Sequence, residues 1–362
     1  MPSTCFAEED CIEASRLFRE AVELSDGSNE EEKMYRGAIE VCPSMAEAYF
    51  NLGVVLTKQG KLKEAIESHR KAAELSGNSD FMAALANLYL KQGLLDEAEV
   101  EFERTLEKDP NCKKALAGLS VLMSKKGDWA NSQKLLEKSI ELDNNDASTF
   151  FNLAVVHQHL GNWTKAISSY ERAVELDPVR FEARFYLGLA YQQKSRFVDA
   201  EKQLVEAARI KPEDPAVHRA LGLAYEKLAD YERAEQAFRR AVDLKPEDAV
   251  SLLNLGIVLM NKNQEGLAES TLKKAIELNP DVAQAFAALG WAQLELGKHS
   301  DAERNLRRAL ELDASDPQVH NNLGVLYQRL GRNEDATKEF RTALRLDPKL
   351  EIAQKNLQQF TQ

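Results

Sequence analysis

Apolar residues recur along the chain at three- and four-residue spacing, in stretches of about a dozen residues, as in amphipathic helices. No segment alternates between apolar and polar residues as a half-buried strand does. Prolines mark a 34-residue period, interrupted only at Asn144 and Ala314; they are Pro110, Pro178, Pro212, Pro246, Pro280 and Pro348. A fixed period of this size indicates stacked two-helix units. The chain is therefore predicted to be all-α.

Nine successive units share the same side-chain types at fixed positions. Counted from Ala46, they begin at residues 46, 79, 113, 147, 181, 215, 249, 283 and 317. Position 7 is always leucine, position 8 is always small, and position 20 is alanine except at Ser132. Six of the position-8 residues are glycines, each costing about 1 kcal/mol relative to alanine in a helix. We expect the missing side chain to let the second helix approach at its position-20 alanine, with larger residues at positions 4, 7, 11 and 24 around that contact.

Turn-forming residues mark where the helices of each unit should begin and end. Position 15 is glycine in six units, which is typical of a helix C-terminus in the left-handed conformation. The proline at position 32 should end the second helix by pushing its predecessor out of the helical region. Asp214 and Asp316, each followed by proline, are predicted to cap the next helix.

With these residues, the chain resembles the tetratricopeptide repeat (TPR) family over residues 46–350. The resemblance implies a right-handed α-solenoid, a superhelix of stacked helix-turn-helix units. Residues 12–45 match a degenerate unit with Arg19 and Glu31 at its small positions, so we expect an N-terminal capping repeat, with Ser28 and Glu31 forming a capping box. Residues 1–11 are expected to form an acidic tail. Residues 351–362 are expected to form a solvating helix, with Ala353, Leu357 and Phe360 on its apolar face.

Charge and cysteine content limit the class of partner. The net charge is −12, of which residues 1–45 supply −7, and an acidic chain repels the phosphates of nucleic acid. No apolar run is long enough to span a membrane, and the N-terminus does not resemble a secretory leader. The four cysteines are too scattered for a metal site; they are Cys5, Cys11, Cys42 and Cys112. Reduced thiols and a cytoplasmic location are therefore predicted.

The sequence contains none of the catalytic motifs that would indicate an enzyme. It has no phosphate-binding glycine loop, no dinucleotide fingerprint, no serine-hydrolase elbow and no HExxH motif. His157 and His159 point about 200° apart on a helix, so they cannot share a metal ion. We therefore predict a protein without enzymatic activity, cofactor or metal site.

The resemblance further implies that the first helix of each unit lines a concave surface through positions 2, 5, 6, 9, 12 and 13. There, amides would bond an extended backbone, aromatic rings would hold apolar side chains and lysines would attract acidic residues. Alternatively, some of the aromatics pack against neighbouring helices and the lysines form a solvated edge. The candidate peptide-binding residues are Phe50, Asn51, Lys58, Asn87, Lys91, Lys125, Phe151, Asn152, Phe185, Tyr186, Lys227, Asn254, Trp291, Asn322 and Arg329.

The predicted function is a scaffold that binds a protein or peptide with acidic and apolar residues in this groove. The carboxylate clamp of co-chaperone members is disfavoured, because Arg219 has the required position but Leu223, Gln284 and Ala288 do not match the remaining ones. One alternative is a stand-alone recognition arm similar to that of O-linked N-acetylglucosamine transferases, based on the position-6 asparagines. Another is a subunit that associates with itself through its terminal repeats.

Overall fold

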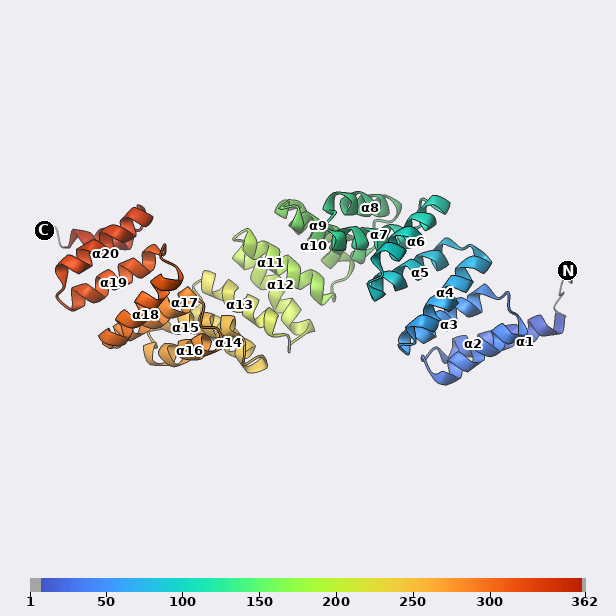
Figure 1. Ribbon diagram of the computed structural model, residues 1–362, viewed down its shortest axis with the longest axis horizontal. Helices are drawn as coiled ribbons and strands as arrows, with labels where there is room; N and C mark the ends of the chain where they lie inside the picture. Colours follow the sequence, from blue (N-terminus) through green and yellow to red (C-terminus); the bar gives the residue numbers. More distant parts are fainter. Residues whose placement is uncertain (1–7, 360–362) are drawn as a thin grey trace. The chain divides into compact units, whose positions relative to one another are not determined.

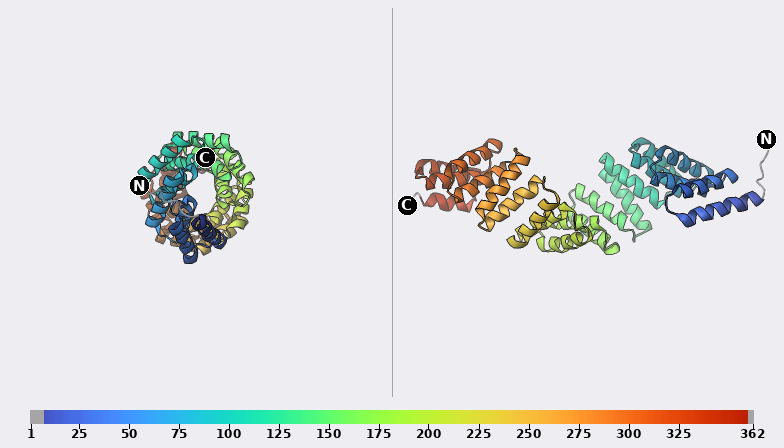
Figure 2. Two further views of the ribbon diagram at one scale, coloured as in Figure 1. Left: turned by 90° about the vertical axis from the view of Figure 1, so that its right-hand side faces the viewer. Right: turned by 90° about the horizontal axis from the view of Figure 1, so that it is seen from below.

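The structure is a computed structural model that describes residues 8–359, and within this range every regular element is an α-helix. The predicted all-α class is therefore confirmed. The chain divides into two compact units, unit 1 ending at Pro178 and unit 2 starting at Val179. In each unit, helices pair as antiparallel hairpins and successive hairpins lie side by side (Figures 1 and 2).

Unit 1 contains ten helices within the described residues. They are α1 (Glu8–Leu24), α2 (Asn29–Val41), α3 (Ala46–Lys58), α4 (Leu62–Ser76), α5 (Ser79–Gln92), α6 (Leu95–Lys108), α7 (Lys113–Lys126), α8 (Trp129–Leu142), α9 (Ala147–His159) and α10 (Trp163–Leu176). Helix α1 starts before the expected boundary at Ile12, so residues 8–11 are helical. Cys5 lies outside the described residues.

Unit 2 contains eleven helices within the described residues. They are α11 (Phe181–Gln193), α12 (Phe197–Ile210), α13 (Pro215–Lys227), α14 (Tyr231–Leu244), α15 (Ala249–Asn261), α16 (Glu265–Leu278), α17 (Ala283–Glu295), α18 (His299–Leu312), α19 (Pro317–Arg329), α20 (Asn333–Leu346) and α21 (Glu351–Gln358). The terminal helix α21 packs on α20 and buries Ala353. Phe360, expected on its apolar face, lies outside the described residues.

Close packing within a hairpin depends on the small residue at position 8, but the nearest side chain is not the expected one. A Cβ added at Gly188 would lie 2.6 Å from Cγ of Leu204, and one at Gly222 would lie 2.7 Å from the ring of Phe238. Leu204 and Phe238 occupy position 24 of the same repeats. The position-20 alanines are fully buried, as expected. The glycine therefore makes room for the large position-24 side chain rather than chiefly for the alanine.

The turn between the two helices of a repeat has one backbone conformation throughout, whatever residue stands at position 15. The six glycines there have φ between 72° and 81°, which confirms the predicted left-handed helix end. The other three repeats place Ser195, Ala229 and Asn263 in the same region, with φ of 57°, 58° and 55°. The packing of the hairpin therefore imposes this turn even where the residue disfavours it.

The ends of the second helices and the predicted aspartate caps follow the sequence signals. Asp177, which precedes Pro178, is non-helical with φ −134° and ψ 86°, and α10 ends at the residue before it. Asp143 has a similar conformation although Asn144 follows it, so proline is not required for the turn. Asp214 accepts a hydrogen bond from the backbone N–H of Ala216, and Asp316 caps α19 in the same way.

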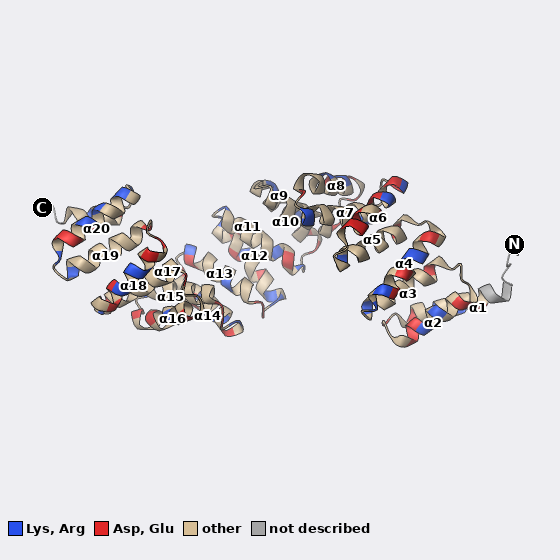
Figure 3. Ribbon diagram, viewed as in Figure 1, with Lys and Arg blue, Asp and Glu red and all other residues tan. Residues whose placement is uncertain are grey.

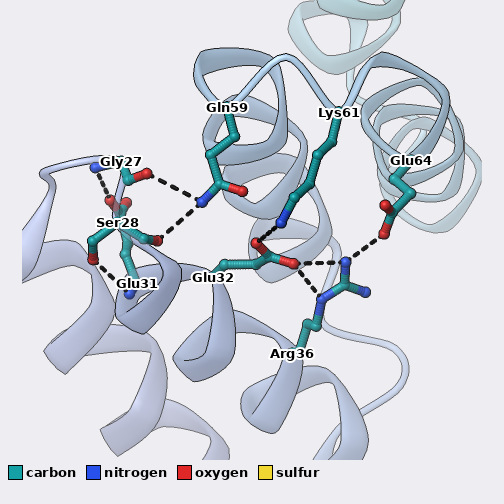
Figure 4. Close-up of polar contacts among 8 residues, drawn as sticks. All are labelled: Gly27, Ser28, Glu31, Glu32, Arg36, Gln59, Lys61 and Glu64. Carbon is teal, nitrogen blue, oxygen red and sulfur yellow. Dashed lines mark hydrogen bonds and ion pairs between the residues drawn. The ribbon is translucent and has the colours of Figure 1, made fainter.

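The N-terminal hairpin, α1 and α2, is held to the next hairpin by polar contacts (Figure 4). Ser28 caps α2 by accepting from the N–H of Glu31, and the Glu31 carboxylate accepts from the N–H of Gly27 at 2.6 Å. The predicted capping box is thus formed, with its second hydrogen bond one residue earlier than usual.

A salt bridge joins this hairpin to the next one, because Lys61 at the N-terminus of α4 pairs with Glu32 of α2 at 2.7 Å. Val22 falls at position 11 of the degenerate unit, where a large residue packs in the other repeats, but it is 45% exposed because the buried stripe of α1 passes through Ala14 and Ala21.

Ion pairs between successive repeats involve many of the basic residues that the sequence spreads over the helices (Figure 3). They join a glutamate at position 21 to a base at position 14, 16 or 19 of the next repeat. Such pairs are Glu99 with Lys126, Glu201 with Arg233, Glu235 with Lys262 and Glu269 with Lys298. This spacing of acidic and basic residues is present in the sequence but was not among the predicted features.

Candidate functional site

The candidate binding residues all lie on the first helices of the repeats, and two cavities gather six of them. The first, here called the α3–α5 cavity, lies in unit 1 and has a volume of about 570 Å³. Four of the predicted residues line this cavity: Phe50 and Lys58 on α3, and Asn87 and Lys91 on α5. Its lining consists of Phe50, Val54, Thr57, Lys58, His69, Asp80, Ala84, Asn87, Leu88, Lys91 and Lys114.

An aromatic cluster forms one wall of the α3–α5 cavity. The ring of Phe50 stacks on Phe81, with 4.3 Å between centroids and 14° between planes, and meets His69 edge-on at 5.2 Å. His69 is buried, and burial lowers its pKa to about 4, so the imidazole is neutral at pH 7. Its Nδ1 atom has no hydrogen-bond partner within residues 8–359. The wall is therefore uncharged and mostly apolar.

Two lysines give the α3–α5 cavity its charge. Lys58 and Lys91 are exposed and form no ion pair within the described part of the chain. At another part of the lining, Lys114 Nζ lies 2.9 Å from Asp80 Oδ2, so that pair is neutralised. A ligand carboxylate near Lys58 and Lys91 would therefore find two cations that form no ion pair, although Asp26 is close enough to Lys58 to be affected by its charge.

The cations at repeat position 13 fall into two groups, which differ in whether they form an ion pair. In unit 1, Lys125 resembles Lys58 and Lys91 in having no ion pair among residues 8–359. In unit 2, Lys227 lies 3.2 Å from Glu226. Arg329 pairs with Glu295 at 2.8 Å and donates to the carbonyl of Leu294. The free positive charge of this row is thus confined to unit 1.

The candidate asparagines also differ from one another. Asn51 donates to the hydroxyl of Tyr35 at 3.2 Å, and Asn87 donates to the carbonyl of Ala83 in its own helix at 2.9 Å. One N–H of each amide is therefore engaged within the protein. Asn152 and Asn254 are half-buried and donate to no protein atom in the described range. A uniform asparagine row is not formed.

Several candidate aromatics pack against neighbouring rings. Phe151 lies 5.8 Å from Tyr170 in a tilted arrangement. Phe185 stacks on Phe181 at 5.6 Å and meets Tyr186 edge-on at 5.5 Å. Phe151 thus contacts the neighbouring helix α10, as the alternative proposed, whereas these ring contacts of Phe185 are with residues of its own helix α11.

The second cavity, here called the α15–α21 cavity, lies in unit 2 and has a volume of about 700 Å³. It brings together Trp291 and Asn322 with several amides that were not among the predicted site residues. Its lining consists of Ile257, Met260, Asn261, Gln284, Ala287, Ala288, Trp291, Asp316, Gln318, Val319, Asn321, Asn322, Val325, Ile352 and Asn356. The abundance of amides at the last repeats was visible in the sequence, but their convergence was not.

Comparison with known families agrees with the repeat architecture. A family model described as the cilia and flagella-associated protein 70 C-terminal domain, of TPR type, matches residues 76–277, more than half of the chain. Two tetratricopeptide repeat models match residues 46–79 and 287–351. The chain belongs to the tetratricopeptide repeat family.

Relatives of this TPR protein share only part of their length with it. DnaJ homolog subfamily C member 3 of Bos taurus is 32% identical over 106 residues, which are 28% of this chain and 20% of that protein. Protein O-mannosyl-transferase TMTC3 of Homo sapiens is 34% identical over 95 residues, which are 26% of this chain and 10% of that protein. The chain thus spans a small part of both relatives.

Solved structures with the same fold cover more of the TPR chain. The APC/C hetero-tetramer Cut9-Hcn1 has a TM-score of 0.53 at 15% identity, covering 99% of this chain and 87% of that one. PilF of Pseudomonas aeruginosa has a TM-score of 0.51 at 21% identity, covering 57% and 94%. At these identities the likeness shows the fold alone.

The TPR helices that the structure describes also bear on metal binding, thiols and membrane insertion. Within it, no group of three histidine, cysteine or acidic residues could hold a metal ion. Cys42 and Cys112 are free thiols. None of the helices described is long and apolar enough to cross a membrane.

Proposed function

We propose that this TPR protein is a non-enzymatic scaffold that holds a segment of a partner protein against its first helices. The observation that carries the proposal is the α3–α5 cavity, where Phe50, Asn87 and two lysines without ion pairs lie together. A segment with an apolar side chain next to an acidic one fits this chemistry. The apolar group would enter beside Phe50, and the acid would lie near Lys58 and Lys91.

Electrostatics supports an acidic segment in particular. The protein as a whole carries a net charge of −12, so unpaired lysines on one surface stand out from a negative background. Exposed charges act mainly by raising the association rate and by excluding wrong partners. Binding should therefore weaken as the salt concentration rises.

A titration with matched charge reversals tests the proposal. The probe is a fluorescein-labelled, end-capped peptide that alternates glutamate with phenylalanine and leucine, followed by fluorescence anisotropy. The double variant Lys58→Glu/Lys91→Glu should raise its Kd by about tenfold or more. The control Lys63→Glu/Lys134→Glu changes the net charge equally, at exposed lysines of unit 1 that do not line the cavity, and should shift Kd by less than about twofold.

Two results would contradict the proposal. Equal losses in both double variants would show that only the overall charge matters. An unchanged Kd in the Lys58/Lys91 variant would show that the cavity is not the site. Circular dichroism of each variant checks that the helices are intact.

A further inference from the structure

We propose that the α15–α21 cavity is a second polypeptide site, which takes an uncharged, extended segment and uses the terminal helix α21 as one wall. The inference deepens the proposed function, because it assigns a different ligand chemistry to another part of the first-helix surface. It rests on that function but on separate residues, all of them in unit 2.

A connected set of amides fixes the orientation of Asn322. Its Oδ1 atom accepts from Gln318 Nε2 at 3.2 Å and from Asn321 Nδ2 at 3.5 Å. Asn321 Oδ1 in turn accepts from Asn356 Nδ2 of α21 at 2.9 Å. Because its oxygen is already occupied, Asn322 has its Nδ2 group left to donate.

The free donor of Asn322 belongs to the cavity. The residue is only 7% exposed and lines the cavity, and its Nδ2 donates to no protein atom among residues 8–359. A donor held in this way suits a fixed acceptor such as a peptide carbonyl. The Nδ2 of Asn322 is not among the buried atoms without a partner, so solvent reaches it, and a ligand carbonyl would take the place of water at this donor.

The charge of the lining separates this cavity from the one in unit 1. Asp316 is the only charged residue among those that line it, and its carboxylate is engaged in accepting from the backbone N–H of Gln318 at 2.8 Å. No lysine or arginine is present to hold a ligand acid. An uncharged segment is therefore favoured over an acidic one.

Apolar side chains make up much of the remaining wall. Trp291 is half-buried, and Ile257 and Val325 lie on neighbouring first helices. From the other side, α21 contributes Ile352, which is 47% exposed. This mixture suits a polypeptide, whose carbonyls and apolar side chains alternate, better than a sugar with hydroxyls on every face. The terminal helix thus lines a cavity in addition to covering the last repeat.

Fluorine NMR of the full chain carrying 5-fluorotryptophan tests the site, because Trp291 is the only tryptophan of unit 2. Trp129 and Trp163 of unit 1 serve as internal references, and single tryptophan-to-phenylalanine variants assign the signals. The probe is an end-capped peptide that alternates asparagine with leucine and valine. It should shift the Trp291 signal in a saturable way, and a counterpart with glutamate in place of asparagine should bind there at least about tenfold more weakly.

Two pairs of variants locate the binding. Asn322→Asp removes the free donor and should raise the Kd by about tenfold, whereas Asn254→Asp, at the same repeat position outside the cavity, should change it by less than about twofold. Ile352→Glu brings a charge to the exposed wall without disturbing a buried residue, and should weaken binding more than Gln354→Glu on the same helix does. Thermal melts of all four variants check folding.

The outcomes distinguish this inference from the proposed function. If the acidic probe binds through Lys58 and Lys91 but no peptide shifts Trp291, the inference fails and the proposed function stands. If Trp291 responds but the lysine variants behave as their control, the unit 1 site fails instead. A Trp291 shift with maltohexaose or chitohexaose but not with peptide, or equal effects of Ile352→Glu and Gln354→Glu, would overturn the inference.

Discussion

Ala229 provides a test of how the repeat turn is held, since it has φ 58° at a position where six other repeats place glycine. The change is Ala229→Gly, and the reverse substitution, Gly297→Ala, is made at the equivalent turn of another repeat. Both residues lie in unit 2, at exposed turns between the two helices of a repeat. A Cβ at Gly297 would meet no heavy atom within 4 Å, so Gly297→Ala creates no clash, and Ala229 is exposed, so its methyl group is not part of the core.

The expected magnitude follows from the backbone alone. The left-handed conformation costs a non-glycine residue roughly 1–2 kcal/mol, and glycine loses about 0.5–1 kcal/mol more conformational entropy than alanine on folding. The turn's hydrogen bonds, from Ala229 N–H to Glu226 and from Asp230 N–H to Tyr225, do not involve the side chain. Ala229→Gly should therefore stabilise the α13–α14 hairpin by about 0.5–1 kcal/mol, and Gly297→Ala should destabilise α17–α18 by a similar amount.

Native-state hydrogen exchange is the suitable assay, because repeat arrays open in segments and a single free energy of unfolding is not defined for them. The opening free energies of amides in α13 and α14 are compared between the parent chain and Ala229→Gly, and those in α17 and α18 for Gly297→Ala. Shifts of the same sign in both variants would refute the reasoning. So would a destabilised α13–α14 hairpin, which would mean that the methyl group of Ala229 contributes more than the backbone strain costs.

Three further predictions concern packing and titration. Ala234→Leu, at a fully buried position 20, should destabilise its hairpin by about 1–3 kcal/mol because the added side chain overpacks the helix pair. Its control, Lys202→Leu on an exposed face, should change stability by less than about 0.5 kcal/mol. Similar melting shifts in the two variants would mean that the repeat positions are misassigned. Burial lowers the pKa of His69 from 6.5 to about 4, so unit 1 should lose stability as the pH falls between these values. His69→Leu, which places there the residue found at position 24 in four other repeats, should abolish that loss in urea titrations followed by circular dichroism. The hydrogen bond from Lys298 lowers the pKa of Glu269 from 4.5 to about 2. The stabilisation from this ionised carboxylate is therefore complete above pH 4.5 and disappears as the pH falls through 2. Glu269→Gln should make stability depend less on pH over this range, and an unchanged pH dependence would contradict the assignment.

The sequence alone determined the elements and the family of this protein. Helix periodicity, aspartate caps, position-15 glycines and position-32 prolines act over a few residues, so they can be recognised without knowledge of the tertiary structure. The same holds for the capping box of Ser28 and Glu31, apart from the shift of one hydrogen bond to Gly27. The candidate binding helices followed from the family resemblance once the repeat positions were fixed.

Only the tertiary structure decided how individual side chains are used. Lys91 and Arg329 occupy the same repeat position, but Arg329 meets Glu295 and Leu294, residues 34 and 35 positions earlier in the chain. The cavity at α21 likewise depends on Asn356 meeting Asn321 across 35 residues. Such contacts are set by the stacking of one repeat on the next. The repeat pattern assigns the same role to equivalent positions, although the residues that surround them in the fold differ. The architecture was therefore readable from local chemistry, whereas the free charges and free amides depended on which residues the stacking brought together.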